Sequence, residues 1–188
     1  MKKIFIAFLL VWFAATTQAA DDLNIIFIGN SISFGATLDD PDTEAAPVRA
    51  CEFLRQQTGR VVNYRNCGVS GMTTVDFLPA GTHQFPNVVK NADDLSKMKG
   101  KLIFSISLGT NDSSEGCFGA PVVGEQYYTN LQAIIDELLR RYPKALFVIQ
   151  YPIWYSPNTY NGARYMQKGL DRLDCYPPMI DRLVQHYA

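Results

Sequence analysis

The stretch Asn-Ile-Ile-Phe-Ile-Gly-Asn-Ser-Ile-Ser (residues 24–33) decides the fold class. Its first half, NIIFI (24–28), is a short, continuous apolar run, which is typical of a strand buried on both faces, as in a parallel sheet. Gly29 ends the run, and a tight turn there would expose the hydroxyl of Ser31, two residues further on. Gly-Asn-Ser is also ordinary turn chemistry, so this stretch alone predicts a strand and a turn, not an activity.

The rest of the chain alternates between strand-like and helix-like patterns. Short apolar runs predict further buried strands, and apolar residues spaced three or four apart predict amphipathic helices. The order strand, helix, strand, helix, strand indicates an α/β fold with a parallel sheet. The predicted strands are 24–28, 61–66, 102–108 and 145–150, and the predicted helices are 45–58, 125–142, 163–173 and 178–187.

The loops after these strands are the place to look for a site, because ligands bind just past the carboxyl ends of parallel strands. Residues 66–74 (NCGVSGMTT) follow the second strand, and their small side chains let backbone N–H groups approach a ligand closely. Gly109-Thr110-Asn111-Asp112 follows the third strand, and the Asn111 amide is suited to donate a hydrogen bond to a developing oxyanion. Three such loops at one sheet edge predict a site, although each alone is more typical of structure.

With these three blocks, the sequence resembles the SGNH or GDSL hydrolases, a family of esterases and lipases on a flavodoxin-like three-layer α/β/α fold. Residues 26–32 match the first block, 66–71 (Asn-x-Gly-x-Ser-Gly) the second and 109–112 the third. The resemblance runs from about Asn24 through the fourth strand. It implies the strand order 2-1-3-4, with a fifth strand expected.

The resemblance implies acyl transfer by covalent catalysis, with Ser31 as the nucleophile. The N–H groups of Ser31 and Gly71 and the Asn111 amide would hold the oxyanion. Asn30 stands where the family usually has Asp, and we place it with Asp112 among the residues that border the substrate. No cofactor is expected, because the loop after the first strand lacks the run of Gly, Ser and Thr that would cradle a phosphate.

The family's general base is a His in an Asp-x-x-His block after the fifth strand, and this sequence has no such block. His186 follows Asp181 by five residues and lies in a predicted helix, which favours a solvent-facing residue. His83 lies between the second and third strands, where a surface or substrate-contacting role is favoured over that of the base. Three explanations stay open: the chain is a fragment, it is complete and inactive, or another His has taken over.

We favour the fragment, because the chain stops at Ala188 inside a helical pattern without a cap. A sheet without its last strand and helix would also expose apolar surface. We therefore expect residues 21–188 to form one SGNH-hydrolase-like domain that is incomplete at its C-terminal end. We expect little or no esterase activity from this chain, and clear Ser31-dependent turnover of p-nitrophenyl acetate would overturn that expectation.

Aromatic residues gather after the fourth strand, in residues 151–165. Trp154 and Tyr155 are the candidates for stacking on sugar rings, and packing as core under the loop is the alternative. No long apolar lid is visible, which argues against long-chain lipids. The remaining members of the cluster are Tyr151, Tyr160 and Tyr165, with Asn158 and Asn161 as hydrogen-bonding groups.

The substrate class follows from the resemblance rather than from single residues. The chain is similar in size and in its N-terminal signal to secreted bacterial carbohydrate deacetylases, which favours a small acyl ester, acetyl above all, on a glycan. One alternative is a secreted glycan-binding protein on the same fold in which Ser31 is idle. Another is a thioesterase or lysophospholipase of the same family.

The first 20 residues are typical of a cleaved secretory signal. Residues 1–3 (MKK) are basic, residues 4–15 are an unbroken apolar run, and residues 17–19 (TQA) have the small-x-small pattern of a signal-peptidase site. The run is shorter than the roughly 20 residues that span a membrane. We expect a secreted or periplasmic protein without stable membrane insertion after cleavage.

The 188 residues, 47% hydrophobic and 19% charged, predict one soluble domain and exclude collagen, disorder and a polytopic membrane protein. A net charge of -1 gives no argument for nucleic-acid binding. Four cysteines in an exported chain permit disulfides, with three connectivities, or buried thiols. They lack CxxC spacing and only two histidines accompany them, so no metal site is expected. The sequence does not determine the oligomeric state. The cysteines are Cys51, Cys67, Cys117 and Cys175.

Overall fold

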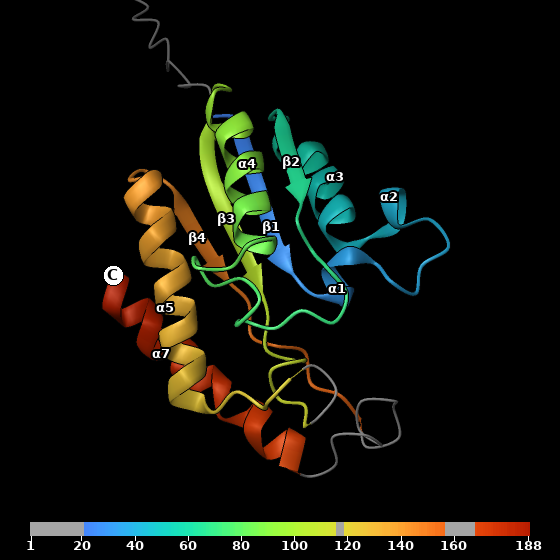
Figure 1. Cartoon of the computed structure of the whole chain (residues 1–188). Helices are drawn as coiled ribbons and strands as arrows, with labels where there is room; N and C mark the ends of the chain where they lie inside the picture. Colours follow the sequence, from blue (N-terminus) through green and yellow to red (C-terminus); the bar gives the residue numbers. More distant parts are fainter. Residues whose placement is uncertain (1–20, 116–118, 157–167) are drawn as a thin grey trace, which may run out of the picture.

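The structure is a computed structural model that describes residues 21–115, 119–156 and 168–188 (Figure 1). The predicted signal at 1–20 and Cys117 lie outside the described residues. So does the first part of the predicted helix 163–173. The same holds for four members of the aromatic segment, namely Asn158, Tyr160, Asn161 and Tyr165.

Four strands form one parallel sheet in the order β2-β1-β3-β4, as predicted (Figure 1). All residues of the central strand β1 are buried, because β2 and β3 flank its edges and core residues cover its side chains on both faces of the sheet. Phe27 of β1 lies in register with Asn66 of β2 and with Ser105 of β3, so the carboxyl ends of these strands meet at one edge. The fifth strand that the resemblance implies is not among the described residues. The strands are β1 Leu23–Gly29, β2 Val62–Asn66, β3 Lys101–Ser107 and β4 Leu146–Ile149.

The helices predicted from apolar periodicity are present, with ends within two residues of the prediction. Residues 168–174, the described part of the predicted helix 163–173 and one residue beyond, are helical as well. Two short helices that were not predicted follow β1. The helices are α1 Ser31–Phe34, α2 Pro41–Glu44, α3 Ala46–Thr58, α4 Gln84–Ser96, α5 Gly124–Arg141 and α7 Tyr176–Tyr187.

Helix α4 is the largest element that the sequence prediction missed, since it assigned no helix between the second and third strands. Phe85, Val88, Ala92 and Leu95 are buried on one side of α4, at the spacing of an amphipathic helix. Pro86 stands in the first turn, where proline is tolerated because its missing N–H has no helical partner. The periodic signal was therefore present in the sequence, and Pro86 is compatible with it.

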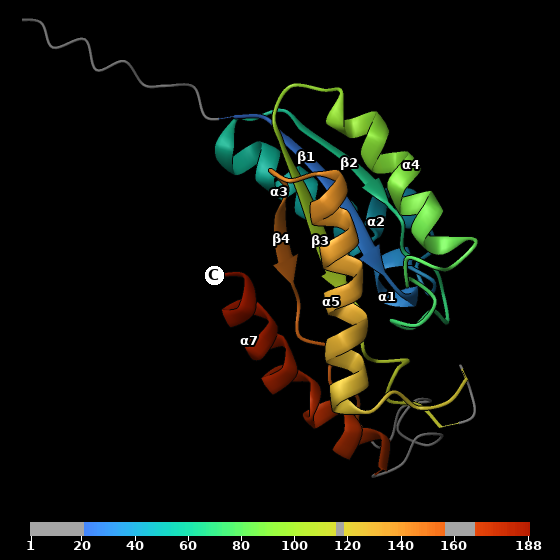
Figure 2. The same cartoon turned by 60° about the vertical axis from the view of Figure 1, so that its left-hand side comes forward.

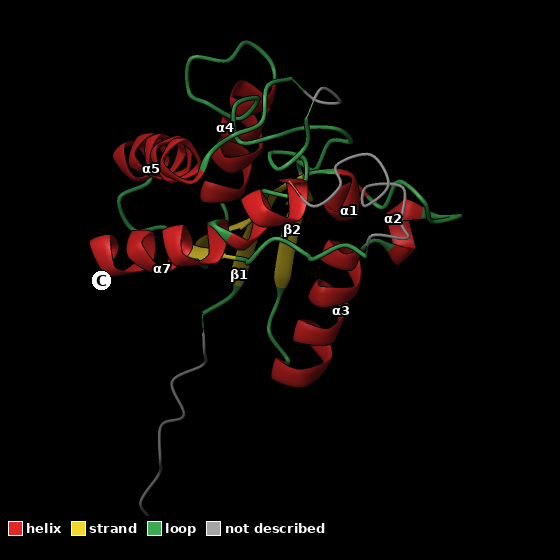
Figure 3. Ribbon diagram, turned by 90° about the horizontal axis from the view of Figure 1, so that it is seen from below, coloured by secondary structure: helices red, strands yellow, loops and turns green. Residues whose placement is uncertain are grey.

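The two faces of the sheet are covered to different extents (Figures 1 and 3). Helices α4 and α5 cover what we call the closed face, and α7 packs against α5 (Figure 2). Helix α3 packs on the opposite face, called here the open face, over β1 and β2. The main core lies on the closed face, with strand residues Ile26, Ile28, Phe104 and Ile106. The core of the open face is smaller and comprises Leu23, Ile25, Phe27, Cys51 and Val62.

The cysteines within the described residues form no disulfide with one another. Cys51 and Cys67 are buried free thiols, and Cys175 is an exposed free thiol. Burial raises the pKa of Cys51 and of Cys67 to about 11, which keeps both thiols protonated at neutral pH. The disulfides that export would permit are thus not formed among these three residues.

Candidate active site

Ser31 is the first residue of α1 and follows β1 after a single intervening residue. That residue, Asn30, caps the helix: its Oδ1 accepts a hydrogen bond from the Ile32 N–H at 3.0 Å. Asn30 is only 2% exposed, so its side chain stabilises the turn and does not lie on the surface, where a contact with substrate was expected. Ser31 itself is half-buried, at the carboxyl edge of the sheet.

Two glycines of the predicted blocks allow α1 to pack closely against its neighbours. A Cβ added at Gly29 would lie 2.0 Å from Ser33 Oγ, and one added at Gly68 would lie 2.8 Å from the Phe34 backbone nitrogen. Both distances are shorter than any real contact, so only glycine fits either position. Gly29 is thus explained by the close packing of α1 on the end of β1, and Gly68 by the approach of the second loop to α1.

Hydrogen bonds fix the start of the second loop beside α1. The side chain of Asn66, at the end of β2, donates from Nδ2 to the Ser33 carbonyl at 2.7 Å and accepts the Gly68 N–H at 3.0 Å. The Val69 N–H donates to the Gly29 carbonyl at 3.0 Å. The loop that leads to Gly71 therefore leaves the sheet next to Ser31.

The second and third loops meet through Asn111. The Asn111 Nδ2 donates to the Met72 carbonyl at 2.9 Å. A primary amide has two N–H donors, so this bond leaves one for another acceptor. Gly71, one residue before Met72, has a φ of 82°, in the left-handed region that favours glycine. The structure thus brings Gly71 and Asn111, both predicted from the sequence, to one place.

Asp112 lies under these loops rather than on their surface. It is 0% exposed, and its Oδ1 accepts hydrogen bonds from the N–H (2.9 Å) and the hydroxyl of Thr74. Its Oδ2 is buried without a hydrogen-bond partner in the part of the chain described. Burial raises the pKa of Asp112 to about 6, against the hydrogen bonds from Thr74, which favour the charged form. The predicted contact of Asp112 with substrate is therefore not supported by its position.

The sequence analysis missed the residues that hold Asp112. The Thr74 hydroxyl accepts a hydrogen bond from Asn130 Nδ2 at 2.9 Å, and Gln126 donates to Asn130 Oδ1. Asn130 is 2% exposed and lies on the apolar side of α5, next to Leu131. A polar residue inside the apolar stripe of a helix is the signal that would have pointed to this network.

The two aromatic residues assigned to substrate binding differ in position. Trp154 is 58% exposed in the segment that follows β4. Tyr155 is 6% exposed, and its hydroxyl lies 3.0 Å from Ser113 Oγ, just past the third block. Tyr155 therefore packs under the loop, which was the alternative considered for this cluster, and Trp154 is available at the surface.

Neither histidine is hydrogen-bonded to Ser31. His186 lies near the end of α7, exposed, with its Nε2 3.3 Å from Gln132 Nε2 of α5. His83 is exposed and occupies the N-cap position of α4. The described residues also contain no group of three or more His, Cys, Asp or Glu side chains that could hold a metal ion. No helix within them is long and apolar enough to cross a membrane.

Comparison with known families gives one match over most of the chain. The sequence profile of the GDSL-like lipase/acylhydrolase family matches residues 27–174. This range contains the second and third blocks and all of the first except Ile26, and it includes Ser31, Gly71 and Asn111. No curated protein sequence matches the chain.

Comparison with solved structures gives esterases. A mutant of esterase AlinE4 is 26% identical, with a TM-score of 0.56, over 86% of this chain and 72% of that one. The psychrotrophic esterase EstA from Pseudoalteromonas sp. is 19% identical, with a TM-score of 0.54, over 85% of this chain and 73% of that one. A mutant of Axe2, an acetyl xylan esterase from Geobacillus stearothermophilus, is 16% identical, with a TM-score of 0.56, over 87% of this chain and 72% of that one. The two more distant similarities concern the fold alone.

Proposed function

The chain belongs to the GDSL-like lipase/acylhydrolase family, a family of ester hydrolases, and on that premise we propose that it hydrolyses small acyl esters with Ser31 as nucleophile. One observation carries the proposal above all. Ser31 begins α1 at the sheet edge where Asn111 is hydrogen-bonded to the loop of Gly71. A nucleophile and oxyanion donors from two different loops are two of the parts that acyl transfer needs, and a base for the serine proton is the third.

The chemistry proceeds in two steps. The Ser31 Oγ attacks the ester carbonyl, and the alcohol leaves once the tetrahedral intermediate collapses to an acyl-enzyme, which water then hydrolyses. The N–H groups of Ser31 and Gly71 and the second Asn111 N–H stabilise the oxyanion. The loss of one such donor typically lowers the rate by about 10²–10³.

The geometry of the histidines limits the rate that we expect. A serine hydroxyl is a weak nucleophile until a base accepts its proton, and neither His83 nor His186 is hydrogen-bonded to Ser31. We therefore expect turnover of p-nitrophenyl acetate by these 188 residues to be little above background. A clear turnover that disappears in Ser31→Ala would show that one of the histidines reaches Ser31 after all.

A reactive fluorophosphonate tests the nucleophile without the need for turnover. We expect slow formation of one covalent adduct, located at Ser31 by peptide mass spectrometry and absent in Ser31→Ala. Ser70→Ala is the matched control, because Ser70 is an exposed serine of the second block. An adduct that persists in Ser31→Ala, or that is lost only in Ser70→Ala, would contradict the assignment.

For the substrate, we propose a small acyl group, acetyl above all, carried by a carbohydrate. The exposed ring of Trp154 follows β4, where it is available for stacking on a sugar. An acetyl xylan esterase has the same fold, so this fold is compatible with such a substrate. Acylation by p-nitrophenyl esters of increasing chain length separates the possibilities: preference for acetyl supports the proposal, and a rate that rises with chain length favours a thioesterase or lysophospholipase.

A second candidate is a glycan-binding protein in which Ser31 is idle. The observation that favours it is the lack of a histidine bonded to Ser31. Glycan binding that survives Ser31→Ala, with no adduct on Ser31 and no hydrolysis, would select this candidate.

Export is the last part of the proposal. The basic start, the apolar run and the Thr-Gln-Ala motif at 17–19 support cleavage near Ala20. N-terminal sequencing of the protein recovered outside the bacterial cytoplasm tests it, and an intact Met1 on that protein would overturn it.

A further inference from the structure

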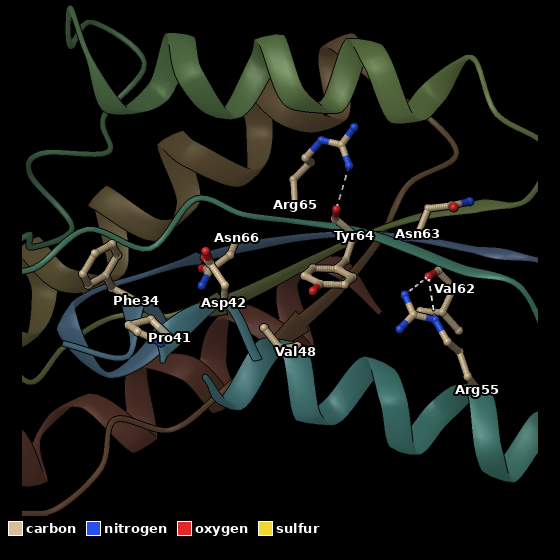
Figure 4. Close-up of a pocket in the computed structure, with 10 residues that line it drawn as sticks. All are labelled: Phe34, Pro41, Asp42, Val48, Arg55, Val62, Asn63, Tyr64, Arg65 and Asn66. Atoms are coloured by element: carbon tan, nitrogen blue, oxygen red, sulfur yellow. Dashed lines mark hydrogen bonds between the residues drawn. The ribbon is translucent and has the colours of Figure 1, made fainter. Parts of the chain in front are cut away.

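A groove of about 700 Å³ runs along the outer edge of β2, between this strand and helices α2 and α3 (Figure 4). This volume is within the range of small-molecule and cofactor sites. Phe34 and Asn66 line one end, and Arg55 and Val62 line the other. β2 has five residues, so the groove follows about 16 Å of strand, enough for more than one sugar ring.

One end of the groove is joined to the proposed nucleophile. Phe34 is the last residue of α1, the helix that Ser31 begins, so the two are about 4.5 Å apart along the helix axis. Asn66 lines the groove and also donates from Nδ2 to the Ser33 carbonyl at 2.7 Å. A chain bound along β2 would therefore end beside Ser31.

The lining combines aromatic rings with hydrogen-bonding groups that lack a partner. Phe34 is 47% exposed, and the half-buried ring of Tyr64 lies on the α3 side of β2 (Figure 4). Within the described residues, the Tyr64 hydroxyl and the Asp42 carboxylate have no hydrogen-bond partner. Carbohydrate sites combine aromatic rings, on which a sugar stacks, with fixed groups that hydrogen-bond to its hydroxyls.

Two features argue against other ligands. The Nε and Nη2 of Arg55 both donate to the Val62 carbonyl, at 3.1 and 2.5 Å, which occupies an acceptor that an added peptide strand would need. Arg55 also lies over the Tyr64 ring, 5.6 Å from its centroid. Charges of both signs line the groove, the Asp42 carboxylate and the guanidinium groups of Arg55 and Arg65, so its lining offers an anionic chain no surface of a single sign.

We propose that this groove binds a neutral oligosaccharide chain and presents its acyl ester to Ser31. The inference rests on the proposed function for the nature of the reaction, but the binding itself requires no hydrolysis. The groove would hold sugar units some distance from the ester, whereas the loops around Ser31 hold the acyl group.

The test uses ligands without an ester. Xylohexaose, cellohexaose and N-acetylchitohexaose are titrated separately into the ¹⁵N-labelled chain, and amide shifts are followed by NMR. We expect at least one to shift the amides of residues 62–66 and to bind equally well to Ser31→Ala. Phe34→Ala, Asp42→Ala and Tyr64→Phe should each raise its Kd about three- to tenfold, the effect of one lost ring contact or hydrogen bond.

Matched controls separate the groove from general surface effects. Phe53→Ala removes an exposed ring (61%) of α3 outside the groove, and Asp39→Ala removes an exposed carboxylate outside it. Both should leave the Kd unchanged. Tyr64→Phe keeps the ring packed at the edge of Phe27, so the fold is retained even if another variant is unstable.

Three results would overturn the proposal that the groove binds an oligosaccharide. The first is that no hexasaccharide shifts the amides of β2, and the second is that binding is insensitive to all three groove substitutions. The third is that an alternating Thr-Val heptapeptide binds there and the sugars do not. Failure of the proposed function looks different. It would appear as the absence of a Ser31 adduct and of hydrolysis while groove-dependent sugar binding persists.

Discussion

The closed and open faces of the sheet differ in how deeply the side chains of the same strands are buried. On the closed face, Phe104 is 0% exposed and its ring stacks on that of Phe147, with centroids 5.3 Å apart. On the open face, Leu146 and Val148 of β4 are 50% and 51% exposed. The alternation of side chains along a strand places the two kinds of residue next to each other in sequence.

The difference teaches that stability and site organisation come from the closed face. Its helix α5 carries Asn130, which reaches Thr74 and through it Asp112 and the loops at the sheet edge. The open face contributes α3 and the groove along β2. Substitutions on the closed face should therefore affect both folding and the loops of the site, whereas those on the open face should cost less stability and act mainly on the groove.

The largest effect is expected at Phe104. Phe104→Ala should lower the free energy of unfolding by about 3–5 kcal/mol, because it leaves a cavity in the main core. Ile103→Ala, one residue earlier and on the other face, should cost about 1–2 kcal/mol, since Ile103 is only partly buried. Urea unfolding followed by circular dichroism measures both. Equal losses would show that the two faces contribute alike.

The next effect concerns the pH dependence of the free energy of unfolding, to which Asp112 contributes. Burial raises the pKa of Asp112 in the folded state to about 6, above its ordinary range, so the folded state binds the proton more tightly than the unfolded state. Protonation of Asp112 therefore stabilises the folded state at low pH. Its contribution to the free energy of unfolding declines by about 3 kcal/mol as the pH rises from about 4 to 6. Asp112→Asn keeps the acceptor for Thr74 and cannot ionise.

Urea unfolding at pH 4.5 and pH 7.5 tests this prediction on the closed-face network. Relative to wild type, Asp112→Asn should gain stability at the higher pH, and the difference should shrink at the lower. Parallel pH profiles for the two proteins would show that Asp112 does not titrate in this range.

A smaller effect is expected in the accessibility of two buried thiols. Cys51 belongs to the open-face core and Cys67 to the closed-face core, and burial raises both pKa values to about 11. With Cys117 and Cys175 replaced by Ser, native-state labelling by a thiol reagent should modify Cys51 about tenfold faster than Cys67, because the smaller core opens more easily. A faster reaction at Cys67 would reverse the order of stability of the two faces.

The smallest effect is expected on the exposed side of β4. Leu146→Lys should change the free energy of unfolding by less than about 0.5 kcal/mol, since half of the side chain already contacts solvent. It should also reduce any self-association seen by light scattering, because a charge on an exposed edge strand disfavours edge-to-edge contact. A large loss of stability would mean that Leu146 is covered in solution.

Much of the fold could be predicted from local patterns. The apolar run before Gly29 was long enough to be recognised as a buried strand, and the spacing of apolar residues in α3 and α5 gave their limits within two residues. The strand order came from the family resemblance. α4 was missed although its apolar stripe is regular and Pro86, in its first turn, is compatible with the start of a helix.

The candidate site could be predicted only in part. Ser31, Gly71 and Asn111 were identified by motif, and the structure places them at one sheet edge. The surroundings were not predictable, because Asn30 and Asp112 are as polar as residues that face a ligand, yet both are buried. The sequence does not distinguish a polar residue that is held by the protein from one that is open to substrate.

The sequence by itself determined the α/β class, the positions of most elements and the residues on which acyl transfer would depend, because these follow from local periodicity and short motifs. Only the tertiary structure decided which polar groups are buried, where the groove lies and which sheet face is closed. The physical reason is distance along the chain. Asn111 and Met72 are 39 residues apart, and Asp112 and Thr74 are 38 apart, so their contacts exist only once the parallel sheet has brought both loops to the same edge.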